Sequence, residues 1–293
     1  MLQDSLLRLR SMMTGLHPRG RRWLRFLAGF ELDPDTLPRP LPAPGENDFI
    51  ICGAPRSGTT LLTAMLFQPP GIVTVMEPWD GMRLPPRDLF RSIRREIDET
   101  GRLSQGKLDV TMLMREGKVR WVDEGEGAHD VQVQDGYLLG VKWPAFWRYL
   151  ELLPDTKFLV CVRDPQEVIT SFKRIGGRLA LGLGYDLAFD RRVNRALSEA
   201  TRDLALRRVL LYEMVYSNVL PHLNRKNVLT VRYERWFDDP ESLLSEVSSF
   251  LGVPLNRRPV GIRSPQDAPG LPRRERDLLS ANCRSMRELG YSI

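Results

Sequence analysis

The stretch FIICGAPRSGTTLL, residues 49–62, decides the fold of this chain. An apolar run of strand length leads into a turn of glycine and hydroxyl residues, and apolar residues with helical spacing follow it. This order is typical of a buried strand, a phosphate-binding loop and the start of a helix. Gly53 and Gly58 allow the backbone amides of the loop to converge, and the helix N-terminus after them favours an anion. We therefore expect an α/β protein organised around an anion-binding loop.

The loop departs at one position from a P-loop that hydrolyses nucleotides. Such a loop has lysine directly after its second glycine, where the amine reaches the transferred phosphate, and here Thr59 stands at that position. Arg56 lies inside the loop instead. The loop therefore predicts an anion that is held by an arginine and by hydroxyl groups, without an obligatory metal ion.

Composition sets only broad limits. The 293 residues are 42% hydrophobic and 27% charged, which is typical of one globular domain, and the net charge of +6 fits an anionic ligand, nucleic acid or membrane surface equally well. The three cysteines form no C-x-x-C pair, which favours buried thiols in a reducing compartment. No apolar run reaches the roughly 18 residues of a membrane span, so we expect a cytoplasmic protein.

Residues 1–46 differ in composition from the rest of the chain. Residues 1–30 are rich in arginine and end in an apolar run at 23–30. This segment is either a basic amphipathic contact to an anionic membrane or a partner, or a helix packed on the domain, and the apolar run is a candidate homodimer contact. Residues 33–45 contain repeated prolines and predict an extended linker. The main domain is expected over residues 47–293.

Four further runs have the composition of strands: residues 72–76, 137–142, 157–162 and 228–233. Helical patterns separate them, including a long helix expected over residues 191–220. This alternation predicts a P-loop NTPase-like fold of three layers, with a central parallel sheet and flanking helices. Glu77, Lys142 and Arg163 directly follow three of these runs, and parallel strands end at one edge, so we expect these side chains to lie near the loop.

A second candidate anion site is VRDPQEVITSF, residues 162–172. Arg163 leaves a predicted strand, Pro165 suits the first turn of a helix, and Ser171 returns two helical turns after Arg163. In this geometry a guanidinium and a hydroxyl can bind one phosphate. The alternative is an Arg163–Asp164 pair that caps a helix, with Ser171 as an ordinary surface residue.

Taken together, the two segments resemble the phosphate-binding motifs of sulfotransferases that use 3'-phosphoadenosine-5'-phosphosulfate (PAPS). The loop motif G-x-P-R-S-G-T-T follows a strand, and V-R-D-P with a later S-F comes about 100 residues further on. The segments at 231–234 and 289–291 also resemble that family. The resemblance runs from about residue 47 to the end, except for residues 84–135.

The resemblance implies PAPS as the cofactor, with no metal required, and it implies which residues bind it. The 5'-phosphosulfate would be held by Arg56, Ser57, Gly58, Thr59 and Thr60. Arg163 and Ser171 would bind the 3'-phosphate. Tyr233 and Ser264 match positions near the nucleotide.

The implied reaction transfers a sulfuryl group to an acceptor hydroxyl, which needs charge stabilisation and a base. Arg56 and Lys142 suit the first role. Glu77 resembles the glutamate base of the carbohydrate, trehalose and tyrosylprotein sulfotransferases, although it could instead be a structural partner of Arg56 or Lys142. The acceptor would be a carbohydrate, glycolipid or small-molecule metabolite. Four aromatic residues nearby would either stack on an acceptor ring or pack in the core; they are Trp79, Trp143, Phe146 and Trp147.

Two other functions stay open from sequence. A P-loop small-molecule kinase would share the loop, although the threonine at position 59 and the segment around Arg163 argue against it. A non-catalytic anion-binding module would need only the loop and the basic N-terminus. Nucleic acid is not an expected partner, because the basic residues do not alternate with aromatic residues along one element.

Overall fold

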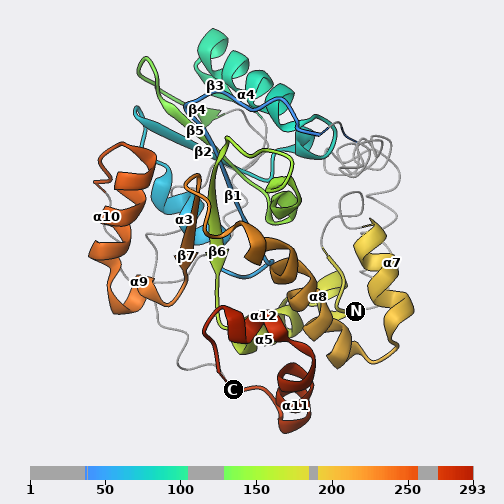
Figure 1. Cartoon of the computed structure of the whole chain (residues 1–293). Coiled ribbons are helices and arrows are strands. Elements are labelled where there is room, and N and C mark those ends of the chain that lie inside the picture. The colour runs from blue at the N-terminus through green and yellow to red at the C-terminus, as the bar shows by residue number, and fades with distance from the viewer. Residues whose placement is uncertain (1–36, 38, 105–128, 185–190, 257–269, 293) are drawn as a thin grey trace, which may run out of the picture.

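The computed structural model describes residues 37, 39–104, 129–184, 191–256 and 270–292. At its centre lies a sheet of five parallel strands in the order β2-β5-β1-β6-β7 (Figure 1). The strands are β1 (Asp48–Gly53), β2 (Ile72–Met76), β5 (Leu138–Lys142), β6 (Lys157–Val162) and β7 (Val228–Arg232). Every pairing within this sheet is parallel. The prediction of a P-loop NTPase-like α/β fold is confirmed, and the strand that precedes the loop is the central one.

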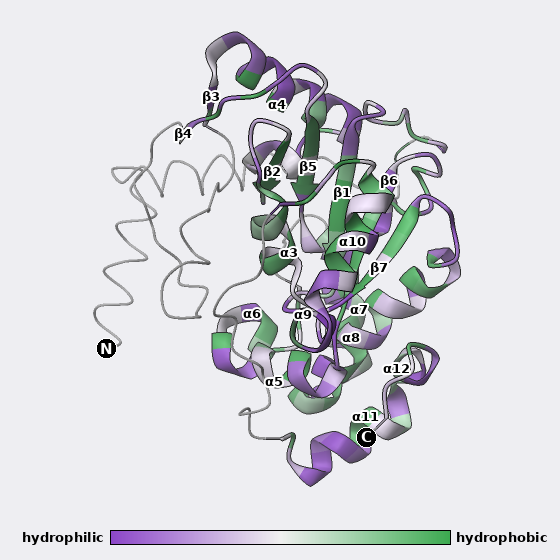
Figure 2. Ribbon diagram, turned by 90° about the vertical axis from the view of Figure 1, so that its left-hand side faces the viewer, coloured by the Kyte–Doolittle hydropathy of each residue, from purple (hydrophilic) through white to green (hydrophobic). Residues whose placement is uncertain are grey.

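Helices cover both faces of the sheet because the side chains of β1 alternate between two apolar cores. Phe49 and Ile51 pack in one core with α3 (Thr59–Leu66) and α10 (Pro240–Leu251). Ile50 and Cys52 pack in the other with α4 (Pro86–Thr100), α5 (Pro165–Ile175) and α8 (Leu204–Val219). Figure 2 shows the hydrophobic strands enclosed between these helices. A strand buried on both faces is expected to be apolar throughout, as β1 is.

The remaining described elements are short. They are η2 (Trp79–Met82), β3 (Arg102–Leu103), β4 (His129–Asp130), η4 (Pro144–Tyr149), α6 (Gly177–Ala180), α7 (Arg191–Ala200), η5 (Leu220–His222), α9 (Arg235–Asp238), α11 (Arg273–Asn282) and α12 (Arg284–Glu288). β3 and β4 form a separate antiparallel pair. No helix in the described ranges is both long and apolar enough to cross a membrane.

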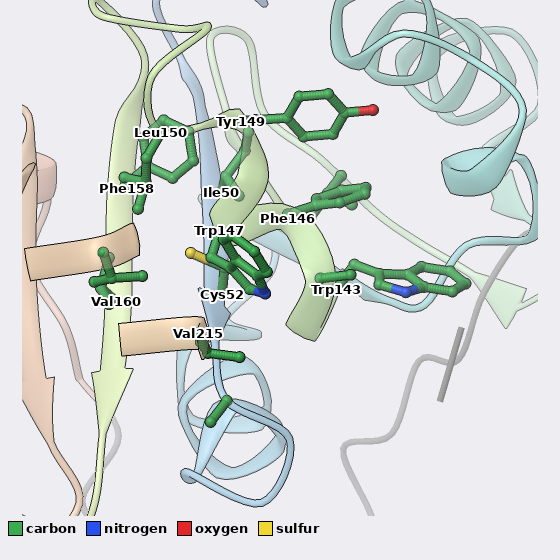
Figure 3. Packing of buried hydrophobic residues seen from close by; sticks show 14 of the residues in the cluster. Ile50, Cys52, Trp143, Phe146, Trp147, Tyr149, Leu150, Phe158, Val160 and Val215 are labelled. Carbon is green, nitrogen blue, oxygen red and sulfur yellow. The ribbon is translucent and has the colours of Figure 1, made fainter. Parts of the chain in front are cut away.

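The aromatic residues after β5 belong to the core. Trp143, Phe146 and Trp147 are at most 9% exposed and belong to the same core cluster as Ile50 and Cys52 of β1. Trp147 lies beside Cys52, and Trp143 stacks on Phe146 with ring centroids 6.1 Å apart (Figure 3). Of the two interpretations of these three residues, the structure supports core packing.

The prediction of one long helix over residues 191–220 is wrong. The chain forms α7 and α8 with a break at residues 201–203. The break arises because Asp203 caps α8: its Oδ1 accepts from the backbone amide of Ala205 at 3.0 Å, and its own amide donates to Thr201 Oγ1 at 3.0 Å. Short polar side chains compete with the helical hydrogen bonds at this point.

The proline-rich segment before β1 contacts the domain. Leu41 is buried, and its amide donates to the Leu152 carbonyl at 2.9 Å. The predicted boundary between residues 46 and 47 stays a prediction, because residues 1–36 lie outside the described part.

Candidate active site

The predicted site residues line the carboxyl edge of the sheet in the order of its strands. Glu77 follows β2, Lys142 ends β5, the loop at 53–58 follows β1, Arg163 follows β6 and Tyr233 follows β7. Residues that are far apart in sequence therefore lie in one row, with the loop in the middle. Open α/β sheets bind their ligands at this edge.

The loop after β1 is tightly packed and partly buried. Gly53 has a φ of 142°, and a Cβ at this position would lie 2.4 Å from the Cys161 carbonyl oxygen of β6. Ser57 is buried, and its hydroxyl donates to the Ala54 carbonyl at 2.7 Å. The loop ends at Gly58, the N-cap of α3, where no side chain caps the helix. The amides at this helix N-terminus provide an environment that favours an anion.

The two threonines of the loop motif open α3. Thr59 is buried, and its carbonyl accepts from the Thr63 hydroxyl at 2.7 Å. Thr60, the next residue, is half-buried. Both therefore lie in the first turn of the helix, beside the loop amides.

Gly58 predicts a measurable packing constraint. Its φ is 98°, and a Cβ there would lie 2.4 Å from Cδ2 of Tyr233, so Gly58→Ala must displace the tyrosine ring. We expect this variant to lose about 2–4 kcal/mol of unfolding free energy, from backbone strain and overpacking together. Gly101→Ala is the matched control, since Gly101 also has positive φ but no atom within 4 Å of the added Cβ. Equal losses in urea denaturation of the two variants would contradict a collision with Tyr233.

The second predicted anion segment meets the loop. Arg163 Nη1 donates to the Arg56 carbonyl at 3.2 Å, and Arg56 Nε donates to the Ser171 hydroxyl at 3.0 Å. The Arg163 guanidinium also lies over the ring of Tyr233, 4.0 Å from its centroid. Arg56, Ser171, Arg163 and Tyr233 thus lie together, and Ser171 contacts Arg56 rather than the Arg163 with which the sequence analysis paired it. Guanidinium groups and hydroxyls are suited to binding phosphate or sulfate.

Glu167 orients Arg163 from within α5. Its Oε2 accepts from Arg163 Nε at 2.7 Å. Burial raises the pKa of Glu167, and the neighbouring Arg163 opposes that shift. Burial also raises the pKa of Tyr233, so its phenol is neutral at physiological pH. The Arg163 guanidinium is therefore held in one orientation, by its ion pair with Glu167 and its contact with the Tyr233 ring.

Glu77 and Lys142 form an ion pair on the other side of the loop. Lys142 Nζ lies 2.6 Å from Glu77 Oε1, and the Glu77 amide donates to the Lys142 carbonyl at 2.8 Å. The lysine side chain is 3% exposed and the glutamate side chain 29%, so the carboxylate is the more accessible member. The pair fits both predicted roles of Glu77, as a base and as a partner of Lys142. A buried lysine paired in this way supplies a fixed positive charge.

Backbone strain points to the same residues. Within the described ranges, Arg56 with φ 71° and Glu77 with φ 48° are the two non-glycine residues that have positive φ. Such conformations cost about 1–3 kcal/mol each and cluster at functional sites. Both residues were predicted from sequence to be catalytic, and those roles stay predictions.

Several residues near the site were not predicted. Glu167 has an i, i+4 spacing from Arg163 that could have identified it. Glu234 accepts from the Asp164 amide at 2.8 Å and from the Tyr291 hydroxyl at 3.0 Å, and no sequence pattern indicated this. Ser264, predicted near the nucleotide, lies outside the described residues.

Comparison with known proteins covers most of the chain. The sequence model described as "Sulfotransferase family" matches residues 48–257. Among curated proteins no match was found.

Solved structures with a similar fold include three sulfotransferases. The sulfotransferase domain of the curacin biosynthetic pathway is 17% identical, with a TM-score of 0.48 over 86% of this chain and 100% of that one. The sulfotransferase domain of the Synechococcus PCC 7002 olefin synthase is 18% identical, with a TM-score of 0.43 over 88% of each chain. A sulfotransferase from Alicyclobacillus acidocaldarius is 16% identical, with a TM-score of 0.43 over 86% of this chain and 98% of that one. Because the family match spans most of the chain and includes both the loop and the Arg163 segment, this protein belongs to the sulfotransferase family.

Proposed function

We propose that this protein transfers a sulfuryl group from PAPS to a hydroxyl group of an acceptor. One observation carries the proposal: the loop and the segment after β6 converge through the Arg163 contact to the Arg56 carbonyl and the Arg56 contact to Ser171. PAPS carries two separate anionic groups, and these two adjoining segments provide guanidinium, hydroxyl and amide donors for them.

The residues have distinct proposed roles in donor binding. The loop amides with Arg56, Ser57, Thr59 and Thr60 bind the 5'-phosphosulfate. Arg163 and Ser171 bind the 3'-phosphate, and the Tyr233 ring keeps the Arg163 guanidinium in place. When bound, PAPS supplies the sulfuryl group and the phosphate that leaves. The donor set fits this group, because cationic and hydroxyl groups come together here: Arg163 donates to the Arg56 carbonyl, and Arg56 donates to the Ser171 hydroxyl.

Glu77 is the proposed base. Its carboxylate is the accessible member of the pair with Lys142, so it can accept the proton of an acceptor hydroxyl. Lys142 fixes the position of the carboxylate and places a positive charge at the β5 end, one strand from the loop. This charge is suited to stabilising negative charge that develops near the loop. This assignment places the protein with the sulfotransferases that use a glutamate base.

The acceptor belongs to one of three hydroxyl-bearing classes, carbohydrate, glycolipid or small-molecule metabolite. Labelled sulfate transfer from PAPS into an extract of the source organism would identify it. Membrane contact through residues 1–30 and dimerisation through residues 23–30 stay predictions, because these residues lie outside the described part.

A nucleotide-binding comparison tests the proposal. We expect 3'-phosphoadenosine-5'-phosphate (PAP), without any metal, to raise the melting temperature, since a ligand at 100 times its Kd stabilises by about 2.7 kcal/mol. ATP with magnesium should have little effect. Stabilisation by ATP with magnesium, but not by PAP, would instead indicate a kinase. No change in melting temperature with either nucleotide would indicate a non-catalytic module. Labelled sulfate transfer from PAPS then confirms or excludes catalysis.

A further inference from the structure

One face of α8 lies against both anion-binding segments, and its side chains have no role in the proposed chemistry. Arg208, Tyr212 and Tyr216 are spaced four residues apart, which places them along one face of the helix. All three are buried. Phenylalanine would fill the core equally well at positions 212 and 216. The two tyrosine hydroxyls bond instead to backbone atoms of the site, which suggests a role beyond core packing.

Tyr216 lies beneath the loop after β1. Its hydroxyl donates to the Cys161 carbonyl at 2.8 Å and accepts from the Ala54 amide at 3.4 Å. A phenol has one proton to donate, and here it joins the end of β6 to the second residue of the loop. Gly53 already packs against the same Cys161 carbonyl, so Tyr216 extends the contact between loop and strand.

Tyr212 contacts the other segment. Its hydroxyl donates to the Arg163 carbonyl at 3.0 Å, in the residue proposed to bind the 3'-phosphate. The rings of Tyr212 and Tyr216 are in contact, with centroids 4.5 Å apart. Burial raises the pKa of both phenols, so both hydroxyls stay protonated and able to donate. The two contacts are therefore held at a spacing set by one turn of the helix.

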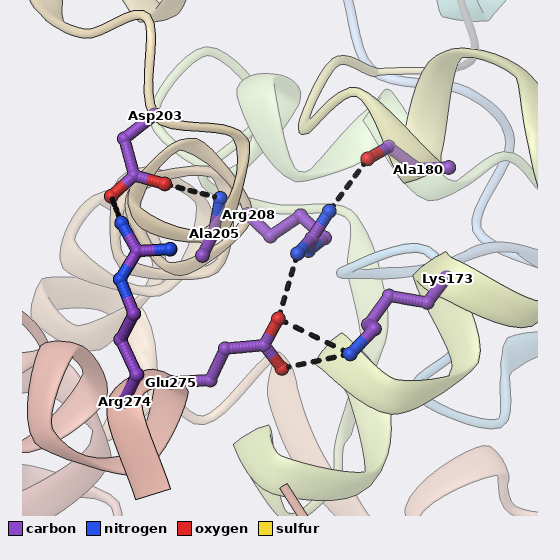
Figure 4. Close-up of polar contacts among 7 residues, drawn as sticks. All are labelled: Lys173, Ala180, Asp203, Ala205, Arg208, Arg274 and Glu275. Carbon is purple, nitrogen blue, oxygen red and sulfur yellow. Dashed lines mark hydrogen bonds and ion pairs between the residues drawn. The ribbon is translucent and has the colours of Figure 1, made fainter. Parts of the chain in front are cut away.

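Arg208 links α8 through Glu275 to α5, the helix that carries Ser171. Its guanidinium donates to the Ala180 carbonyl and to Glu275, each at 2.8 Å (Figure 4). Glu275 of α11 is buried and also pairs with Lys173 of α5 at 3.1 Å. Since breaking a buried pair leaves an uncompensated charge, this network resists movement of α8 relative to α5. The face of α8 that carries Tyr212 and Tyr216 is thus also the face that Arg208 anchors.

We propose that Tyr212 and Tyr216 are positioning residues that set the spacing between the two anion-binding segments, and so determine preference for a nucleotide phosphorylated at both the 3' and 5' positions. Tyr212 acts on the 3' segment through the Arg163 backbone. Tyr216 acts on the 5' loop through Ala54 and the β6 end. The proposed preference rests on the proposed function, whereas the support of the loop by Tyr216 does not.

Binding of PAP and of adenosine 5'-phosphate (AMP) to the whole chain tests the proposal, because the two nucleotides differ only in the 3'-phosphate. We expect Tyr212→Phe to lower the affinity for PAP about tenfold and to leave the affinity for AMP within about twofold, since a buried hydrogen bond is lost on the 3' side only. Tyr216→Phe should lower the affinities for PAP and AMP to a similar extent. Equal effects of Tyr212→Phe on PAP and AMP, or none, would overturn the role of Tyr212.

Tyr137→Phe is the matched control. Tyr137 is also buried, and its hydroxyl binds Asp98 at 3.3 Å, but it lies before β5 at the opposite edge of the sheet. Loss of the Tyr137 hydroxyl should change the affinity for neither PAP nor AMP. If Tyr137→Phe changed the ratio of the two affinities as Tyr212→Phe does, general destabilisation would explain the result for Tyr212.

Amide hydrogen exchange gives a measurement that does not depend on binding of PAPS or PAP. Tyr216→Phe should speed exchange of the Ala54 amide at least tenfold while Tyr137→Phe leaves it unchanged. If the parent chain bound no PAP, the proposed function would fail, together with the nucleotide preference. Unchanged exchange at Ala54 in Tyr216→Phe would by itself overturn the positioning role of Tyr216.

Discussion

We expect Glu77→Gln to lower the turnover number of sulfate transfer by about 10²- to 10⁴-fold, the range for removal of a general base. The substitution keeps the shape of the side chain and can still accept from Lys142, 2.6 Å away, but it cannot take a proton from the acceptor. PAP affinity should stay within about twofold of the parent, because Glu77 follows β2, two strands from the loop after β1. Turnover from labelled PAPS and binding of PAP are the measurements.

The control for Glu77→Gln is Asp80→Asn. Asp80 lies three residues further on in η2, and its side chain has a similar exposed fraction of 34%. This variant should keep turnover within a few-fold. A parent-like turnover for Glu77→Gln, with an unchanged melting temperature, would mean that Glu77 is only a structural partner of Lys142. A fall in turnover that follows loss of folded protein would be visible in the same melting curves.

We expect Arg56→Ala to weaken PAP binding by about 10- to 100-fold, because hydrogen bonds to charged groups contribute about 1.5–3 kcal/mol. The side chain lies between the loop and α5, where its Nε binds Ser171, so its removal affects both proposed phosphate sites. Arg56→Lys should recover part of the lost affinity, since a lysine keeps the charge but not the fork of donors. Titration calorimetry with PAP measures all three proteins.

Arg174→Ala separates a local contact from general electrostatic attraction. Arg174 is exposed on α5, three residues after Ser171, so its removal lowers the net charge by the same amount. We expect PAP affinity to change less than threefold, because exposed charges are screened by salt. Equal losses for Arg56→Ala and Arg174→Ala would contradict a specific role for Arg56.

Local sequence was sufficient for the elements that carry the site. The run before Gly53 predicted a buried strand, and the run before Arg163 predicted another with its observed bounds at Lys157–Val162. These predictions succeed because hydrophobic periodicity and glycine at positive φ are properties of adjacent residues. The helix over 191–220 failed for a related reason: capping by Asp203 outweighed an otherwise continuous helical pattern.

Partners within the site were less predictable. The sequence indicated that Glu77 could pair with Arg56 or Lys142, and only the structure identifies the Lys142 pair. It indicated an anion site at Arg163 but not that Glu167 and Tyr233 hold the guanidinium. Each of these contacts depends on side-chain directions at strand ends, which sequence spacing does not specify.

The sequence by itself determined the strand, loop and helix at residues 49–62, the second anion segment and the family resemblance, because each depends on residues that are close in the chain. Only the tertiary structure decided that Arg56 meets Ser171, 115 residues away, and that Tyr216 supports Ala54, 162 residues away. The physical reason is the strand order β2-β5-β1-β6-β7 and the packing of α8 beneath it. The strand order and the packing of α8 bring distant segments together because they bury apolar surface. No local pattern specifies which of these segments will be in contact.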